Sequence, residues 1–242
     1  MRTADKLLRP QLCEYLRGFV HEERDNRIKE VLEKRTRYVT VAVEDLYQTQ
    51  NISAVLRSCE CYGVQDVHVI ENENEFQIHS AISMGSNKWL TIHRYKNEEH
   101  NTARCLKTLK EKGYTLVATL PNDDSLYLDE LPIDSPTAFV FGTELTGLSE
   151  EAIAMCDKTM KIPMYGFTES FNISNSAAIT LSSFVERVRH SQVKWQLSDD
   201  EYSELYFEWL QKSIKNADFI TAVWNVFTTS ISDRADKILC VS

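Results

Sequence analysis

The order of apolar and polar positions divides the chain into short β-branched runs and longer amphipathic stretches. The run YVTVAVED, which begins at Tyr38, has the length and composition of a buried strand. Strand-like runs then alternate with helical patterns, and such alternation predicts an α/β fold with a mostly parallel sheet and helices on both faces. Further strands are predicted at 66–70, 89–93, 115–119, 137–141 and 159–162, and helices at 51–62, 98–112 and 149–156.

Helical patterns also flank the predicted sheet. Residues 3–35 have the pattern of two helices divided near Gly18, and residues 199–214 have that of another. Each flanking pattern has a narrow apolar stripe that needs a partner surface. We therefore divide the chain into an N-terminal helical arm (1–37), a central domain (38–192), and a C-terminal helix and tail (193–242).

Length and charge limit the range of functions. A chain of 242 residues, 43% of them hydrophobic, can bury the core of one domain with appendages, or at most two domains. The formal net charge of −9 argues mildly against a simple nucleic-acid coat. Residues 1–37, however, carry ten Lys or Arg against seven Asp or Glu. That arm fits either a solvated helix face of mixed charge or an arm that contacts RNA.

Several classes of protein are not expected from this sequence. It has no apolar window of about 18 residues and no signal-peptide pattern at its start, so we expect no membrane segment. The six cysteines form no C-x-x-C pair, which is typical of reduced thiols in a cytoplasmic protein. The six histidines have no metal-ligand spacing, so no metal site is expected.

The candidate chemistry gathers where predicted strands end. Gly142, Gly147 and Gly166 lie in two loops that each follow a strand, and ligands in parallel α/β folds bind at such loops. There is no G-x-G-x-x-G and no G-K-[ST], which argues against a Rossmann site or a P-loop. A helix follows the second loop, and either Asn172 or Ser174 can cap it.

A third loop follows the first predicted strand. Asn51 is the expected N-cap of the next helix, and Arg57 lies farther along that helix. Because helical side chains lean toward the N-terminus, we expect the Arg57 guanidinium to reach back to Asn51. Taken alone, such an arginine is read as an ordinary surface residue.

Three segments in order resemble a known family. They are NISAVLRSCECYGV (51–64), FVFGTELTGLSEEA (139–152) and KIPMYGFTESFNISNSAAI (161–179). They look like the three motifs of the SPOUT superfamily, in its SpoU/TrmH branch of RNA ribose 2′-O-methyltransferases. The resemblance covers about residues 20–212. It implies a C-terminal trefoil knot, S-adenosylmethionine as cofactor, and a homodimer.

The resemblance also gives roles to individual residues. Arg57 and Asn51 match the motif residues that are implied to place the target ribose and its phosphate. Glu144 matches the glutamate of the second motif, and Ser170 and Asn172 match the serine and asparagine of the third. The residues implied to surround the cofactor are Thr119, Leu120, Gly142, Leu145, Gly147, Ile162, Met164 and Phe171, where Phe171 replaces the usual leucine.

The implied reaction can be compared with these residue types. The enzyme must align the ribose 2′-oxygen with the methyl carbon, about 3 Å away, and must take up the hydroxyl proton. A guanidinium has a pKa above about 12 and rarely acts as a base. Our hypothesis is that Arg57 clamps a phosphate and polarises the hydroxyl, with that phosphate or a water as proton acceptor. Glu144 and Asn172 fit a role in ordering the loops at least as well as direct chemistry.

The substrate is a finer inference. Helical extensions on both sides of the central domain resemble those of branch members that methylate the D-loop guanosine at tRNA position 18. The alternatives are another tRNA or rRNA nucleotide, or a non-catalytic RNA-binding protein of the superfamily. The apolar stripe from Ile173 to Val188 fits a dimer interface and core packing equally well. Residues 216–242 match no part of the family, and the run 219–231 fits a strand, a helix or an ordered tail.

Overall fold

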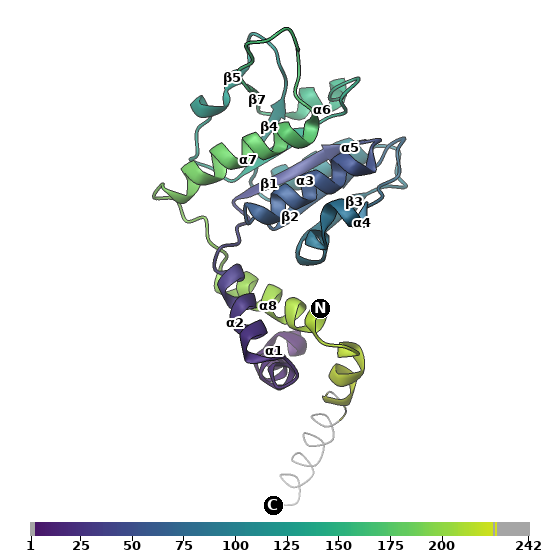
Figure 1. Ribbon diagram of the computed structural model, residues 1–242, viewed down its shortest axis with the longest axis vertical. Coiled ribbons are helices and arrows are strands. Elements are labelled where there is room, and N and C mark those ends of the chain that lie inside the picture. Colours follow the sequence, from purple (N-terminus) through teal and green to yellow (C-terminus); the bar gives the residue numbers. More distant parts are fainter. Residues whose placement is uncertain (1–2, 225, 227–242) are drawn as a thin grey trace, which may run out of the picture. The chain divides into compact units, whose positions relative to one another are not determined.

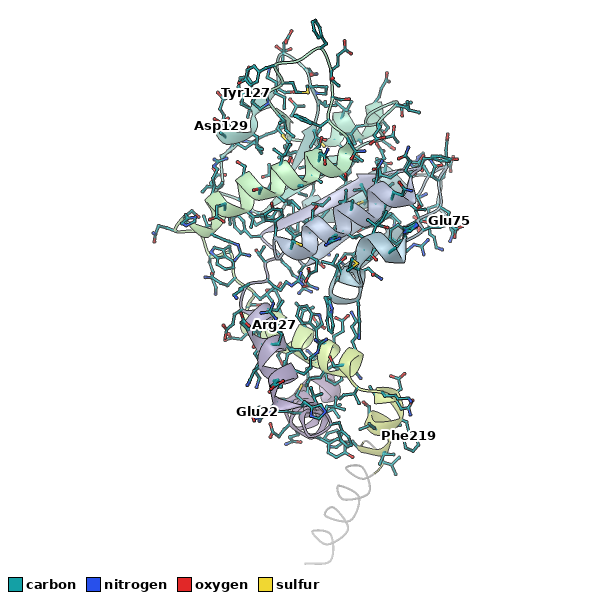
Figure 2. All side chains as sticks on the ribbon, viewed as in Figure 1. Glu22, Arg27, Glu75, Tyr127, Asp129 and Phe219 are labelled. Atoms are coloured by element: carbon teal, nitrogen blue, oxygen red, sulfur yellow. The ribbon has the colours of Figure 1, made fainter. Side chains whose placement is uncertain are left out.

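The computed structural model describes residues 3–224 and Val226, with the side chains of residues 3–8 and Ser80 left out. The chain forms two compact units. One unit spans residues 35–196, and the other joins the described parts of residues 1–34 and 197–242. Figure 1 labels most elements of both units, and Figure 2 adds their side chains.

The larger unit is built on a seven-stranded sheet in the order β3-β2-β1-β6-β4-β7-β5. Every neighbouring pair of strands in it is parallel. This confirms the predicted α/β class, while the trefoil knot stays a prediction. The strands are β1 (Val39–Glu44), β2 (Asp66–Ile70), β3 (Thr91–Tyr95), β4 (Thr115–Thr119), β5 (Leu126–Tyr127), β6 (Thr137–Phe141) and β7 (Lys158–Lys161).

Helices cover both faces of this sheet, as predicted. Helices α3 (Thr49–Cys61) and α7 (Ile173–Arg189) pack on one face. Helices α5 (Asn101–Glu111) and α6 (Glu150–Met155) pack on the other. Neighbouring residues of a strand point to opposite faces, so Val41 joins the first core and Ala42 the second.

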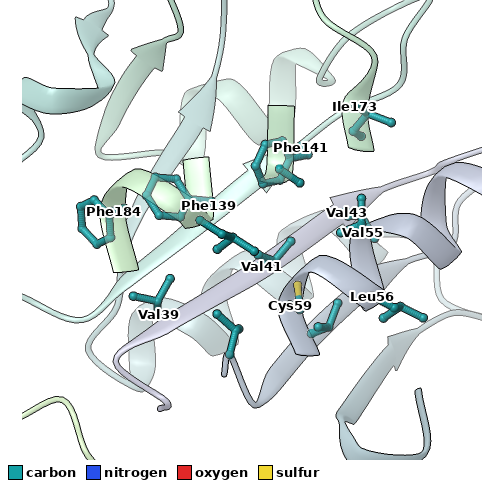
Figure 3. Close-up of a cluster of buried hydrophobic side chains, with 14 of the residues drawn as sticks. Val39, Val41, Val43, Val55, Leu56, Cys59, Phe139, Phe141, Ile173 and Phe184 are labelled. Carbon is teal, nitrogen blue, oxygen red and sulfur yellow. The ribbon is translucent and has the colours of Figure 1, made fainter. Parts of the chain in front are cut away.

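The apolar stripe of α7 belongs to the first core. Ile173, Phe184 and Val188 are buried against β1, β6 and α3 within the same chain. Figure 3 shows Phe184 beside Phe139, and Ile173 near Phe141. Of the two readings of this stripe, the structure therefore supports core packing.

Most element boundaries agree with the sequence pattern to within two or three residues. The predictions for β2, β4 and β6 match the structure, while β3 begins two residues later than predicted. Strand β5 and three short helices were not predicted, because elements of two to four residues have no measurable periodicity. The short helices are α4 (Ser80–Ser83), η1 (Ser86–Trp89) and η2 (Leu128–Glu130).

The carboxyl end of β1 is fixed by a buried carboxylate. Glu44 accepts hydrogen bonds from Thr102 Oγ1 at 2.7 Å, from Ser149 N at 2.8 Å and from Ser149 Oγ at 2.7 Å. These contacts join β1 to the starts of α5 and α6, and a buried carboxylate needs such partners. The loops that follow β1 and β6 are thus held at one end of the sheet.

The smaller unit contains three main helices. They are α1 (Thr3–Arg17), α2 (Glu22–Leu32) and α8 (Asp199–Ser213), and their apolar stripes are buried together. Asp25 is buried among them and accepts hydrogen bonds from Lys29 Nζ at 2.7 Å and Tyr206 Oη at 2.6 Å. Burial alone would raise the pKa of Asp25, but these donors and Arg17 hold it below its usual value.

The C-terminal segment is helical again from residue 217 to residue 224. The rest of the predicted run at 219–231 lies outside the described residues, apart from Val226. Among the described helices, none combines the length and the apolar character needed to cross a bilayer.

The loop after β2 depends on an ion pair. Glu71 accepts two hydrogen bonds from Arg94, both at 2.7 Å, and one from the Phe76 N–H at 2.8 Å. The hydrogen bonds from Arg94 hold the pKa of Glu71 below its usual value.

A variant in this loop tests how Glu71 makes the stability of the domain depend on pH. We expect Glu71→Gln to lower the free energy of unfolding by about 1–2 kcal/mol at pH 7, because hydrogen bonds to a charged group are lost. The stabilisation from Glu71 is fully present above its unfolded pKa of about 4.3 and is lost as the pH falls through the lower folded pKa. The difference from wild type should therefore shrink as the pH falls below about 4.3, as measured by urea unfolding between pH 7 and pH 3. Glu73→Gln, an exposed change in the same loop, should match wild type, and a pH-independent difference would contradict this account.

Candidate functional site

Three loops at the carboxyl ends of β4, β6 and β7 enclose a cavity of about 370 Å³. Because the strands are parallel and adjacent, these loops meet at one edge of the sheet. All eight residues that were predicted to surround a cofactor line this cavity: Thr119, Leu120, Gly142, Leu145, Gly147, Ile162, Met164 and Phe171.

The loop after β6 folds back on itself to form one wall of the cavity. The Thr143 N–H donates to the Gly147 carbonyl at 2.9 Å, and the Gly147 N–H donates back at 3.1 Å. A Cβ placed on Gly142 would lie 2.2 Å from the Gly147 carbonyl carbon and 2.3 Å from the Leu148 nitrogen. Position 142 must therefore be glycine for this turn to close.

Three of the predicted site residues form one polar cluster. Asn51 Nδ2 donates to Glu144 Oε1 at 3.1 Å, and Asn172 Nδ2 donates to Asn51 Oδ1 at 3.1 Å. Asn172 Nδ2 also donates to Glu144 Oε1. Side chains from three segments that are far apart in sequence thus hold one another beside the cavity, which Glu144 itself lines together with Ser170.

Asn172 also begins α7. Its Oδ1 accepts a hydrogen bond from the Ser174 N–H at 2.9 Å, so Asn172 is the N-cap of that helix. Of the two caps that the sequence allowed, Asn172 is the one observed. One side chain therefore both starts the helix and joins the polar cluster.

The prediction that Asn51 caps α3 is wrong. The helix begins at Thr49, its N-cap is Gln48, and Asn51 lies within the first turn. Its side-chain amide donates to Gln48 Oε1 at 3.1 Å as well as to Glu144, so both N–H groups are occupied by partners outside the helix backbone. The contact with Glu144 could not be read from local sequence, because the two residues are 93 positions apart.

Arg57 is exposed on α3 and does not line the cavity. Among the described residues it has no hydrogen bond or ion pair. An α-helix advances 1.5 Å and turns by about 100° per residue, so Arg57 lies about 9 Å along the axis from Asn51 and about 120° around it. Within one chain, therefore, the structure does not support the prediction that Arg57 reaches back to Asn51.

The cavity has further lining residues that were not predicted. Among them are Pro121, Thr143, Lys161, Glu169 and Ser176. Each lies within four residues of a predicted one, so proximity in the same loops was the available signal. Among the described residues, no group of three or more His, Cys, Asp or Glu side chains is arranged to hold a metal ion.

A half-open cavity at the carboxyl ends of parallel strands, beside a cluster of amide and carboxylate side chains, defines the class of an α/β enzyme domain. The chain belongs to the SpoU rRNA Methylase family, whose model matches residues 38–182.

Similar proteins extend this assignment over most of the chain. A tRNA (guanosine(18)-2′-O)-methyltransferase of Borreliella burgdorferi is 41% identical over 210 residues, which are 87% of this chain and 94% of the relative. The protein of that name from Thermus thermophilus is 35% identical and covers 79% of this chain and 97% of its own. The crystal structure of the A. aeolicus TrmH/SpoU tRNA modifying enzyme superposes with a TM-score of 0.71 at 31% identity, covering 81% of this chain and 98% of that one.

Proposed function

We propose that this protein is an S-adenosylmethionine-dependent methyltransferase that modifies the ribose 2′-hydroxyl of the guanosine at tRNA position 18. The observation that carries the proposal is the 41% identity to a tRNA (guanosine(18)-2′-O)-methyltransferase along 94% of that relative's length. The cavity and its polar cluster also support the proposal, because they contain residues that match the family's motifs.

The cavity fits the cofactor in size and chemistry. About 370 Å³ lies within the range of small-molecule sites, and the lining mixes apolar side chains such as Leu120 and Ile162 with backbone groups of three loops. The cofactor, when bound, supplies a methyl group on a sulfonium centre. The chain's part is to hold the ribose oxygen in line with that methyl group and to exclude water.

We propose that the polar cluster orders the loops of the site and that Arg57 binds the substrate. Asn51, Glu144 and Asn172 satisfy one another, which suits groups that fix the loops. Arg57 is an exposed guanidinium that can clamp the phosphate next to the target ribose in a bidentate way. With the hydroxyl held in line with the cofactor's methyl group, its proton would pass to that phosphate or to water.

The position of Arg57 supports a homodimer. Its side chain does not line the cavity of its own chain, so a second copy is proposed to present Arg57 to that cavity. Exposed apolar side chains border the site, including Leu145 at 96% exposure and Tyr165 at 97%. Such a group of exposed apolar side chains is typical of a protein interface.

Incubation with methyl-labelled S-adenosylmethionine and separate pools of tRNA and ribosomal RNA tests the substrate. We expect label in tRNA only, and we expect primer extension at low nucleotide concentration to stop next to position 18. A stop at another tRNA position would correct the target, and label in ribosomal RNA alone would replace the substrate. RNA binding without any label would favour the non-catalytic alternative.

A further inference from the structure

A second cavity of about 630 Å³ lies beside the start of α3. One wall comes from the end of the loop after β1 and the first turn of α3, with Tyr47, Gln48 and Gln50. The other comes from the loop after β2, with Asn74, Glu75 and Gln77. Figure 2 labels Glu75 on this second loop. The lining thus offers an aromatic ring, amides and one carboxylate.

The wall that carries Glu75 is held in place from both sides. Asp45 Oδ1 accepts hydrogen bonds from three successive backbone N–H groups, those of residues 72, 73 and 74, at 3.0, 2.8 and 2.8 Å. Phe76 is buried, and its N–H donates to Glu71. Because Phe76 is anchored, the backbone at its exposed neighbours Glu75 and Gln77 is held in place.

The cavity adjoins the polar cluster through Gln48. Gln48 lines the cavity and its Oε1 accepts a hydrogen bond from Asn51 Nδ2 at 3.1 Å. Asn51 in turn donates to Glu144, which lines the cofactor cavity. A ribose placed at the polar cluster would therefore have this second cavity next to it, within reach of its base.

We propose that this cavity binds the base of the target nucleotide and selects guanine. The inference rests on the proposed methyltransferase function. Guanine presents two adjacent N–H donors and a carbonyl acceptor. A carboxylate such as Glu75 accepts from both donors, and the amides of Gln50 and Gln77 can donate to the carbonyl. Tyr47, which is 80% exposed, offers a ring face on which the base stacks.

The charge of the lining favours a base over a phosphate. Glu75 lines the cavity, and Glu73 lies two residues before it, while none of the seven lining residues is Lys or Arg. An anionic phosphate would be repelled, whereas the donor edge of guanine is attracted. Adenine has a ring-nitrogen acceptor at the position where guanine has an N–H donor. That acceptor would lie against the carboxylate of Glu75, which is also an acceptor, so adenine is disfavoured.

Three tRNA transcripts carrying guanosine, inosine or adenosine at the mapped position test this proposal. Wild type should prefer guanosine to adenosine by roughly tenfold or more in kcat/KM, because a bidentate pair discriminates between bases by that order. Inosine lacks the exocyclic amine and should fall between them. With Glu75→Gln, the kcat/KM values for the three transcripts should lie within about threefold of one another. Glu73→Gln makes the same charge change two residues away and should keep the wild-type preference for guanosine.

The stacking side chain has its own pair of variants. Tyr47→Ala should raise the KM for all three transcripts by about tenfold with kcat little changed, while Tyr47→Phe should match wild type. If wild type methylates the guanosine transcript and Glu75→Gln keeps the full preference for guanosine, the proposal that this cavity selects the base is wrong.

Filter binding of the same transcripts separates this proposal from the proposed function. If wild type methylates no transcript, the proposed methyltransferase function is wrong. The proposal that the second cavity binds guanine is then tested by transcript binding alone. Tighter binding of the guanosine transcript that is lost in Glu75→Gln would support it. Equal binding of all three transcripts by wild type would overturn it.

Discussion

Arg57→Ala should lower kcat for methyl transfer to tRNA by about 10²–10³-fold, since removing one charge-stabilising donor from an active site has an effect of that size. Arg57 is exposed, lies outside the cofactor cavity and has no partner among the described residues. The variant should therefore keep the wild-type melting temperature and bind S-adenosylmethionine normally by calorimetry. Arg104→Ala, a change of an exposed arginine on α5, serves as the control and should leave kcat unchanged.

Arg57→Lys distinguishes the proposed clamp from a simple positive charge. Lysine keeps the charge but lacks the planar fork that holds two phosphate oxygens. We expect a loss of at least tenfold in kcat, and near-full activity would contradict a bidentate clamp. If Arg57→Ala itself stayed fully active, the assignment of Arg57 to the substrate would be wrong.

Gly142→Ala should damage both the cofactor cavity and the stability of the domain. The added Cβ would lie 2.2 Å from the Gly147 carbonyl, so the backbone of the turn after β6 must move. We expect a loss of about 1–3 kcal/mol in the free energy of unfolding, as for other overpacked sites. Displacement of the loop by about 1 Å should reduce kcat/KM by about 10²-fold. Urea unfolding and calorimetric titration with S-adenosylmethionine measure the two effects.

Gly166→Ala is the matched control for that variant. A Cβ at position 166 has the Thr168 nitrogen as its nearest neighbour, at 4.0 Å, and Gly166 does not line the cavity. It should bind the cofactor and unfold like wild type. Equal behaviour of the two alanine variants would show that closure of the turn at Gly142 does not shape the site.

The sequence predicts most of the larger unit because its strands are long enough to have a period. The β-branched run of β1 and the buried runs of β2, β4 and β6 stand out without any tertiary information. Most residues around the cofactor cavity were also predictable, since the second and third motifs contain the loops after β6 and β7. Thr119 and Leu120, at the end of β4, lie outside the three motifs and came from the wider family resemblance.

What the sequence could not give are contacts that depend on the three-dimensional fold. The Asn51 side chain looked like a helix cap, but it meets Glu144 only after β1 and β6 pair. The burial of the α1, α2 and α8 stripes in one unit joins segments from opposite ends of the chain. The second cavity was missed because Tyr47 and Glu75 belong to no motif and meet only when β1 and β2 lie side by side.

The central claim is that the methyl group goes to a ribose oxygen of a tRNA guanosine. It is tested most directly by digesting tRNA from the wild-type and Arg57→Ala reactions to nucleosides and identifying the labelled product by mass spectrometry. The account predicts 2′-O-methylguanosine from wild type, with the label on the ribose fragment, and almost none from Arg57→Ala. A label on the base fragment, or equal amounts of 2′-O-methylguanosine from both proteins, would contradict it.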